Sequence, residues 1–466
     1  MPDTSEFPGT VNQGRGGKPG HITYDHVRRK AVVIHPEPKA LKKQSGRILR
    51  DAEACLEEAC GLAVAIDLEI VDAQLLSLNN WRPATIIGQG KIDELKTLFE
   101  ETKAEVLIVN AHVTPVQQRN LERAIGTKVI DRTGLILEIF GERARTKEGV
   151  LQVELAHLSY QQSRLVRTWT HLERQRGGFG FMGGPGETQI ETDRRLIRDR
   201  ISRLKKQLAE VKRTRSLHRK ERKKVPYPVV ALVGYTNAGK STLFNHLTRS
   251  EVQAEDMLFA TLDPTLRMVK TPAGRQVILS DTVGFISDLP TQLIAAFHAT
   301  LEEVTEADLL LHIHDAHHPD KDAQAQDVLN VIEGLGVNTH QRDALDFKPL
   351  INVYNKCDLL NDEERAFYSL KCAQNPKENT SISAVTGEGC AALLGLIDQI
   401  LDQKENVFEV RFPLHDGATF AWIHEAGTVI SSSIADDSHH IITVRLGSRH
   451  IGQLKSKKEV KVEMLS

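Results

Sequence analysis

The sequence GYTNAGKST (residues 234–242) has the spacing GxxxxGK[ST] of a phosphate-binding loop. Gly234 and Gly239 permit a tight turn in which backbone N–H groups surround phosphate oxygens. Lys240 is expected to neutralise the β- and γ-phosphates, and the hydroxyl of Ser241 is expected to bind Mg²⁺. An apolar run precedes the motif and a helical pattern follows it, so the sequence predicts the strand, loop and helix that such a site needs.

A second motif, SDTVGF (280–285), follows another apolar run. Asp281 is placed to hold Mg²⁺ through a water, and the N–H of Gly284 is placed to contact the γ-phosphate. The next residue is Phe285, where Ras-type GTPases carry the glutamine that orients the attacking water. A phenyl ring can neither donate nor accept that hydrogen bond. The sequence therefore predicts a site that a partner completes, with another side chain in residues 259–288 as the alternative.

Two further segments specify the base. The run PLINVYNKCD predicts a buried strand that ends in Asn355, Lys356 and Asp358. The Asp358 carboxylate can accept two hydrogen bonds from the N1–H and N2–H₂ edge of guanine, whereas adenine would leave it unpaired. In SISAV (381–385), a backbone amide can meet guanine O6. Together these segments predict GTP, not ATP, as the nucleotide.

The segment LFATLDPT (258–265) is short and polar and has no strand pattern, as expected of a loop that only the γ-phosphate and Mg²⁺ order. We expect Thr261 to supply its Mg²⁺-binding hydroxyl, with Thr265 as the second choice. Catalytic roles are assigned to Lys240, Gly284 and Thr261, and metal contacts to Ser241, Thr261 and, through a water, Asp281. The predicted nucleotide contacts are Gly234, Tyr235, Thr236, Asn237, Ala238, Gly239, Lys240, Ser241, Thr242, Phe259, Ala260, Thr261, Leu262, Asp263, Asp281, Thr282, Val283, Gly284, Asn355, Lys356, Asp358, Ser383, Ala384 and Val385.

The domains that position these residues can be outlined from the whole sequence. Its 466 residues, 40% of them hydrophobic, predict a soluble protein of about three domains. A polar, Gly- and Pro-rich tail is predicted to be disordered over residues 1–27. An α/β domain around a largely parallel sheet is predicted for 28–146, a P-loop GTPase domain (G domain) for 225–403 and a small α+β domain for 404–466. Within the first domain, strands are predicted at 30–36, 84–88, 104–110 and 127–131, and helices at 45–59, 91–101 and 115–126.

Residues 147–224 carry two helical patterns, which predict an antiparallel hairpin with facing apolar seams. The first seam begins with Leu151, Leu155 and Leu158, and the second includes Ile201, Leu204 and Leu208. An ordinary pair of helices in a bundle core is the alternative.

The loop that joins the two helices, RGGFGFMGGPGETQ, places Phe179, Phe181 and Met182 among six glycines. Exposed rings at an extended tip suit stacking on bases or filling a pocket. Residues 191–224, which include Arg194 and Arg195, hold fifteen Lys and Arg against five Asp and Glu. A solvated basic face is the alternative, but beside an aromatic tip this charge favours RNA binding.

Other features narrow the setting. The five cysteines form no CxxC pair, which indicates reduced thiols in the cytoplasm and neither disulfides nor structural zinc. No stretch approaches the about 18 apolar residues of a membrane span, and the basic helices lack aromatic residues to insert into lipid, so we expect no stable membrane insertion. A monomer is expected. HIHDAHH (312–318) could suggest metal ligands, but its first residues belong to a strand pattern.

Taken together, the motifs resemble the HflX family of translational GTPases. The resemblance rests on GYTNAGKSTLFN, LFATLDPT, SDTVGFISDLP and NKCD, and on the upstream signature GGPGETQIETDRR (183–195). It covers roughly residues 30–400 and, more weakly, the rest. Proteins of this family bind the large ribosomal subunit, can split stalled or idle ribosomes, and carry a hydrophobic residue in place of the catalytic glutamine.

The resemblance implies a Mg²⁺-dependent GTPase whose helical hairpin reaches toward the peptidyl-transferase region. The large subunit and its rRNA would be bound through the basic hairpin and its tip loop, including Phe179, Phe181, Met182, Arg194 and Arg195. Two alternatives stay open: a GTPase in large-subunit assembly, and an RNA-binding module that holds GTP as a structural ligand.

Overall fold

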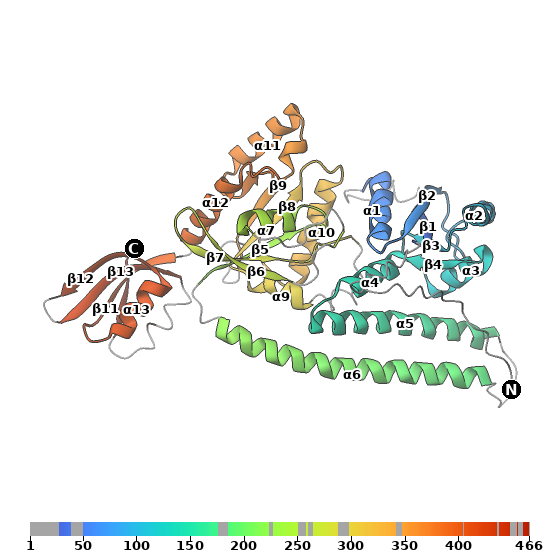
Figure 1. Ribbon diagram of the computed structural model, residues 1–466, viewed down its shortest axis with the longest axis horizontal. Helices are drawn as coiled ribbons and strands as arrows, with labels where there is room; N and C mark the ends of the chain where they lie inside the picture. Colours follow the sequence, from blue (N-terminus) through green and yellow to red (C-terminus); the bar gives the residue numbers. More distant parts are fainter. Residues whose placement is uncertain are drawn as a thin grey trace, which may run out of the picture.

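The computed structural model describes residues 28–38, 50–175, 185–222, 227–249, 258–259, 264–287, 298–341, 347–403, 405–435, 438–447, 454 and 460–465. Figure 1 shows an N-terminal sheet with its helices, a central G-domain sheet and a smaller C-terminal sheet, with two long helices running alongside the first two. This arrangement confirms the predicted fold class. The exact domain boundaries stay predictions. Within the described residues, no helix has the length and apolar character to cross a membrane.

The N-terminal sheet is wholly parallel, with strand order β2-β1-β3-β4. Helices α1 and α4 pack on one face, and α2 and α3 pack on the other. The strands are β1 (Lys30–Pro38), β2 (Glu69–Leu78), β3 (Val106–Val109) and β4 (Lys128–Asp131). The helices are α1 (Ala52–Val64), α2 (Gln89–Thr102), α3 (Pro115–Ile125) and α4 (Arg132–Arg143).

Two predictions for this domain were wrong. Residues 84–88 form no strand but a turn closed by an isolated bridge between Arg82 and Ile86. Ile86 and Ile87 are apolar because their side chains extend from that turn into the core, where each is 1% exposed. The missed strand is β2, an edge strand whose residues are mostly half-exposed and so lack a continuous apolar run. In addition, the helix expected from residue 45 begins at Ala52, where the Asp51 side chain caps it.

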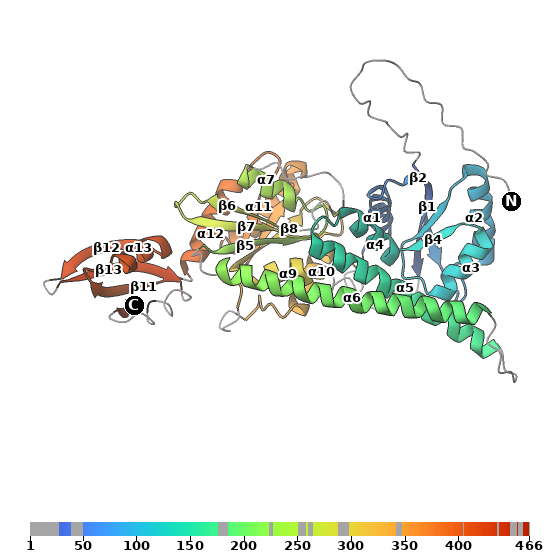
Figure 2. The same cartoon turned by 60° about the horizontal axis from the view of Figure 1, so that its bottom comes forward.

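The hairpin consists of α5 (Lys147–Gln175) and α6 (Pro185–Arg222), which lie antiparallel (Figure 2). On α6 the expected seam is buried, with Leu204 fully inaccessible. On α5 the expected leucines are only half-buried, whereas Val153 and Ala156 are buried against the α4 side of the N-terminal domain. Helix α5 lies between α6 and that domain, so its buried residues include Val153 and Ala156, whereas the three leucines of the predicted seam are only partly covered. The tip, with Phe179, Phe181 and Met182, lies outside the described residues.

The G-domain sheet has the order β10-β9-β8-β5-β7-β6, and only β6 is antiparallel to its neighbour. Its strands are β5 (Val229–Gly234), β6 (Thr265–Lys270), β7 (Gln276–Asp281), β8 (Leu309–Asp315), β9 (Leu350–Asn355) and β10 (Asn379–Ser381). Its helices are α7 (Lys240–Thr248), α9 (His298–Glu306), α10 (Lys321–Gly334), α11 (Asp362–Gln374) and α12 (Cys390–Gln403). Because β5, β7 and β9 are parallel, their carboxyl ends bring the three predicted motifs to one edge.

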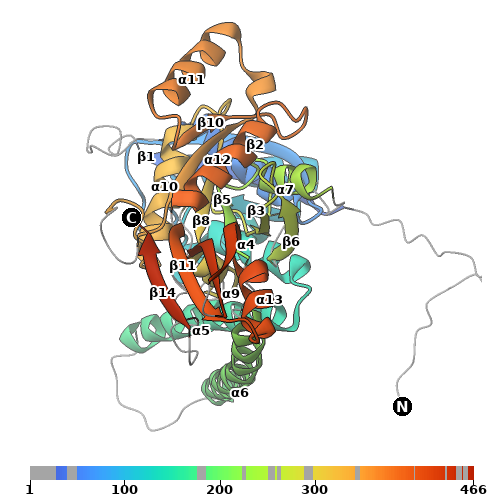
Figure 3. The same ribbon diagram turned by 90° about the vertical axis from the view of Figure 1, so that its left-hand side faces the viewer.

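The C-terminal domain is an antiparallel sheet, β12-β13-β11-β14, with helix α13 packed on it. Its core is the apolar face of the sheet, including Phe408, Val410 and Phe412. The bounds are β11 (Glu405–Pro413), α13 (Gly417–Ala426), β12 (Thr428–Ala435), β13 (His439–Gly447) and β14 (Lys461–Leu465). Figure 3, viewed from the C-terminal end, shows α11 and α6 on opposite sides of the molecule.

Candidate nucleotide site

The phosphate-binding loop connects β5 to α7 as the sequence predicts. Lys240 is 6% exposed, and its Nζ donates hydrogen bonds to the carbonyl oxygens of Gly234 (3.1 Å) and Tyr235 (2.7 Å). Burial lowers the pKa of Lys240 to about 8, although nearby Asp281 opposes that shift. Gly239 has φ of 89°, and a Cβ there would collide with Asn355 Nδ2, so only glycine fits.

The residues expected to hold Mg²⁺ meet behind this loop. Ser241 Oγ donates a 2.8 Å hydrogen bond to Oδ2 of Asp281, which is fully buried at the end of β7. A hydroxyl and a carboxylate are the hard oxygen donors that Mg²⁺ prefers, so the pair fits the ion. Thr261, the expected third contributor, lies outside the described residues together with Ala260, Leu262 and Asp263. Thr265, the second choice, starts β6 opposite Asp281.

The end expected to bind guanine is tied together by Asn355. Its Nδ2 donates to the carbonyl of Ala238 (2.8 Å), and its Oδ1 accepts from the amide of Ala384 (2.9 Å). One buried side chain therefore joins the phosphate loop to the segment expected at guanine O6. Lys356 adopts a left-handed conformation and pairs with Asp315 at 2.7 Å. Asp358 is half-exposed, and its contact with the base stays a prediction.

The side chain of Phe285 lies in the apolar core. Its side chain is 2% exposed and belongs to an apolar cluster with Val283 and Phe259. Its backbone pairs with the phosphate loop: its N–H donates to the Gly234 carbonyl at 3.1 Å, and its carbonyl accepts from the Thr236 amide at 2.8 Å. Residue 285 is therefore hydrophobic because it anchors the loop after β7, here called switch II (residues 282–287), in the core.

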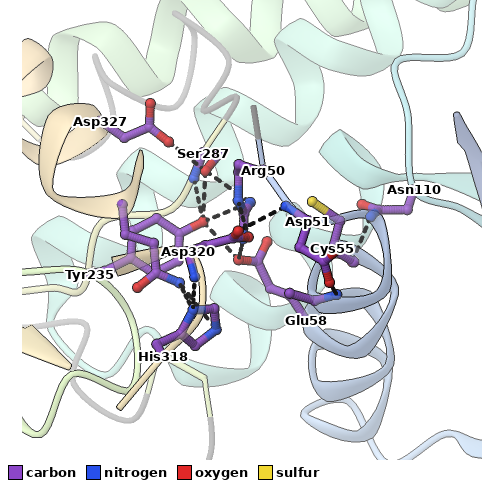
Figure 4. A network of polar contacts seen from close by, with 12 residues as sticks. Arg50, Asp51, Cys55, Glu58, Asn110, Tyr235, Ser287, His318, Asp320 and Asp327 are labelled. Carbon is purple, nitrogen blue, oxygen red and sulfur yellow. Dashed lines mark hydrogen bonds and ion pairs between the residues drawn. The ribbon is translucent and has the colours of Figure 1, made fainter. Parts of the chain in front are cut away.

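A polar network links this region to the N-terminal domain (Figure 4). Arg50 donates to the Tyr235 hydroxyl (3.2 Å) and to Ser287 Oγ (3.0 Å). The same guanidinium pairs with Glu58 at 2.8 Å and with Asp320, at the start of α10, at 3.2 Å. The Tyr235 hydroxyl in turn donates to Glu58 at 2.7 Å. Tyr235 lies in the phosphate loop and Ser287 in switch II, so both loops are fixed to one set of N-terminal charges.

A second arginine, Arg132 at the start of α4, completes the network. It pairs with Glu58 Oε1 at 2.5 Å, and donates to the Ser287 carbonyl at 3.2 Å and to Asn110 at 2.8 Å. Burial opposes the ionisation of Glu58, but Arg132 and Arg50 outweigh it and lower its pKa to about 2. Glu58 is therefore a carboxylate at neutral pH, held between two cations.

Apolar contacts reinforce the junction. The rings of Phe140, from α4, and Phe259 meet edge to face with centroids 4.7 Å apart. Leu258 packs so closely on α1 that a Cβ at Gly61 would lie 3.1 Å from its Cδ1. A single buried cluster thus runs from the N-terminal sheet into the G domain. The partners of these N-terminal residues lie far away in the chain, so no local pattern in the sequence predicts the junction.

The first four residues of HIHDAHH (312–315) lie on a strand, as expected, and the last three lie in the turn that follows it. His312 and His314 are on β8 with stacked rings, and burial lowers the pKa of each. Among the described residues, no group of His, Cys, Asp and Glu is arranged to hold a metal ion.

Family comparisons account for most of the chain. Residues 53–141 and 143–222 match models described as "GTP-binding GTPase N-terminal" and "GTP-binding GTPase Middle Region". Residues 229–356 match "50S ribosome-binding GTPase", and residues 369–461 match "HflX C-terminal domain". A GTPase HflX of Magnetococcus marinus is 50% identical over 414 residues, 89% of this chain and 93% of that protein. The chain belongs to the HflX family.

A second HflX protein agrees with this assignment, and one solved structure is also similar to the chain. The GTPase HflX of Escherichia coli K12 is 43% identical over 364 residues, 78% of this chain and 83% of its own length. A crystal structure named "SsGBP and GDP complex" is 24% identical with a TM-score of 0.47, and covers 80% of this chain and 99% of its own. As an HflX protein with a P-loop GTPase domain, this chain is a GTPase that binds GTP.

Proposed function

We propose that this GTPase depends on Mg²⁺, binds the large (50S) ribosomal subunit as a monomer in the cytoplasm, and splits stalled or idle ribosomes. We further propose that the ribosome stimulates hydrolysis. The observation that carries the proposal is the surface of α6. The apolar residues Ile201, Leu204 and Leu208 on one face of α6 are buried. The cations of the helix are exposed, namely Arg195, Arg198, Arg203, Lys205 and Lys206. A long helix with such a face suits the phosphate backbone of rRNA.

The chemistry is assigned to the residues of the nucleotide site. Lys240 and the loop amides would stabilise charge on the transferred phosphoryl group, with Gly284 contacting the γ-phosphate. Ser241, Asp281 and Thr261 would hold Mg²⁺, which when bound neutralises charge on the β- and γ-phosphates. Asp358 and residues 383–385 would select guanine. Gly284 suits its role because a Cβ there would lie 2.8 Å from Thr236 Cγ2 and 2.9 Å from the Thr236 Cα, so only glycine lets the loop approach so closely.

The buried position of Phe285 supports the proposal that the ribosome stimulates hydrolysis. Because its ring is part of the core, residue 285 contributes no group that could order a water or stabilise charge. A charge-stabilising element that a partner supplies is worth about 10³–10⁵ in rate, whichever residue of this chain positions the water. The ribosome is the partner that the 50S-binding description of the G domain supports.

Sedimentation tests the proposal. Intact ribosomes incubated with the protein and GTP should separate into subunits, and alanine at Arg198, Arg203 and Lys206 should weaken binding and flatten its salt dependence. Lys240→Ala, which removes the phosphate-binding amine, is the control that should leave ribosomes intact. Association with immature large-subunit particles alone would instead indicate a role in assembly.

Turnover tests the stimulation separately. GTP hydrolysis should rise at least tenfold when purified large subunits are added, and equal rates with and without them would remove the ribosome from the mechanism. No phosphate release with any ribosomal partner, combined with RNA binding that survives Lys240→Ala, would indicate a structural nucleotide in an RNA-binding module.

A further inference from the structure

Thr236, the third residue of the phosphate-binding loop, holds a buried hydroxyl without a bonding partner. The residue is 6% exposed, and its Oγ1 makes no hydrogen bond to any part of the chain that the structure describes. An unsatisfied buried hydroxyl costs about 1–3 kcal/mol. Such a group in a folded protein calls for an explanation, and a ligand or a catalytic role is one.

The position of Thr236 indicates which ligand. Its amide is fixed to switch II by the hydrogen bond to the Phe285 carbonyl. A Cβ placed on Gly284 would lie 2.8 Å from Thr236 Cγ2 and 3.1 Å from Lys240 Nζ. The Thr236 methyl group and the lysine amine therefore both lie beside the glycine expected to contact the γ-phosphate. That is the end of the site where hydrolytic water must enter.

Since Phe285 is turned into the core, the water lacks its usual partner on switch II. A threonine hydroxyl offers one donor and two acceptor sites, enough to accept from a water and donate to a phosphate oxygen at once. We propose that Thr236 Oγ1 is a catalytic group that positions the attacking water against the γ-phosphate of GTP, in place of the glutamine that Phe285 replaces.

The step is hydrolysis without a covalent intermediate. The water oxygen forms a bond to the γ-phosphorus as the bond from that phosphorus to the β–γ bridging oxygen breaks. GDP leaves with the electron pair, and the water proton passes to a γ-phosphate oxygen. Thr236 keeps its own proton throughout, because its role is to orient and not to act as a base.

Two substitutions separate this role from packing. Thr236→Val replaces the hydroxyl with a methyl group of nearly the same size, so it preserves shape and removes the chemistry. Thr236→Ser keeps the hydroxyl and removes the methyl group that lies against Gly284. If Thr236 only fills space, Thr236→Ser should slow hydrolysis more than Thr236→Val. If the hydroxyl positions the attacking water, Thr236→Val should slow hydrolysis more.

Single-turnover hydrolysis by the full-length protein with Mg²⁺ and excess enzyme tests this. Thr236→Val is expected to slow hydrolysis about 10–100-fold, and Thr236→Ser by less than about threefold. Affinity for a fluorescent GDP should stay within about twofold in both, and Thr236→Val should melt no lower than wild type, since it removes an unpaired polar group. Wild-type hydrolysis by Thr236→Val, or an equal loss in Thr236→Ser, would overturn the proposal.

The proposed role of Thr236 rests on the proposed function, because it concerns the hydrolysis of GTP. The assay nevertheless distinguishes a failure of the Thr236 proposal from a failure of the ribosomal proposal. Measurements without ribosomes report on Thr236 alone, and the same measurements with large subunits report on stimulation. A wild type that ribosomes fail to stimulate would count against the ribosomal proposal, while a slow Thr236→Val without ribosomes would still support the catalytic hydroxyl.

Discussion

The two ends of the nucleotide site are held in different ways. At the guanine end, Asn355 makes neutral hydrogen bonds to Ala238 and Ala384, and all three residues belong to the G domain. At the switch end, the phosphate loop and switch II are fixed through Tyr235 and Ser287 to charges from another domain. The bonds of Asn355 at the expected guanine end thus stay within one domain, whereas those at the switch end cross between two domains.

The difference shows what the N-terminal domain contributes. Buried ion clusters are poor sources of net stability, because desolvation offsets much of the attraction, but they fix geometry strictly. Glu58 lies between two arginines and accepts from Tyr235, so any shift of the domain would leave buried charges unpaired. The position of switch II is therefore bound to the docking of a domain that contains none of the predicted nucleotide contacts.

The largest effect should come from breaking this cluster. Arg132→Ala removes the cation with the closest contact to Glu58 and leaves that carboxylate buried with only Arg50. We expect a loss of about 3–5 kcal/mol in the free energy of unfolding, measured by urea denaturation. The matched control is Arg200→Ala, which breaks the exposed pair with Glu154 on the hairpin and should cost at most about 1 kcal/mol. Equal losses in the two variants would mean that the junction is no stronger than a surface ion pair.

The meeting of the nucleotide motifs at one edge of the G-domain sheet could be predicted from the sequence, because each motif is contiguous and stands at the end of an apolar strand. GxxxxGKS, DTVG and NKCD each place several functional atoms within a few residues, and parallel strands bring the motifs to one edge. The repeat of apolar residues also predicted correctly that Leu204 is buried on α6, the helix that packs against α5.

The switch end could not be predicted in that way. Glu58 lies in an ordinary acidic helix turn, and its partners Arg132 and Tyr235 are 74 and 177 residues away. No spacing rule in one sequence reports such pairs. The error at residues 84–88 has a similar origin, because Ile86 and Ile87 are apolar for tertiary packing and not for a local strand.

An intermediate effect is expected at the guanine end. Asn355→Ala removes both hydrogen bonds and leaves the Ala384 amide and the Ala238 carbonyl without this partner. Each such group costs about 1–3 kcal/mol, so GDP affinity should fall about 10²-fold, measured by fluorescence titration. Asn352→Ala, on the same strand, loses only a bond to Asn379 and one to His314 and should bind GDP normally. If both variants bind GDP equally, the bridge through Asn355 does not organise the site.

The smallest expected effect is that of pH on the free energy of unfolding. Lowering the pH should weaken the contacts at the switch end, which include an ionised carboxylate, and leave the neutral hydrogen bonds of Asn355 unchanged. The pKa of Glu58 falls from 4.5 to about 2 on folding, so its carboxylate stabilises the fold above about pH 4.5, and that contribution is lost as the pH falls toward 2. Wild type and Glu58→Gln should therefore differ less in unfolding free energy at pH 3.5 than at pH 6, by about 1 kcal/mol. Asn355→Ala, whose bonds do not titrate, should keep a constant difference from wild type over the same range. A gap between wild type and Glu58→Gln that stays constant with pH would show that the two arginines do not hold Glu58 ionised, and the contrast between the two ends would then be one of position and not of charge.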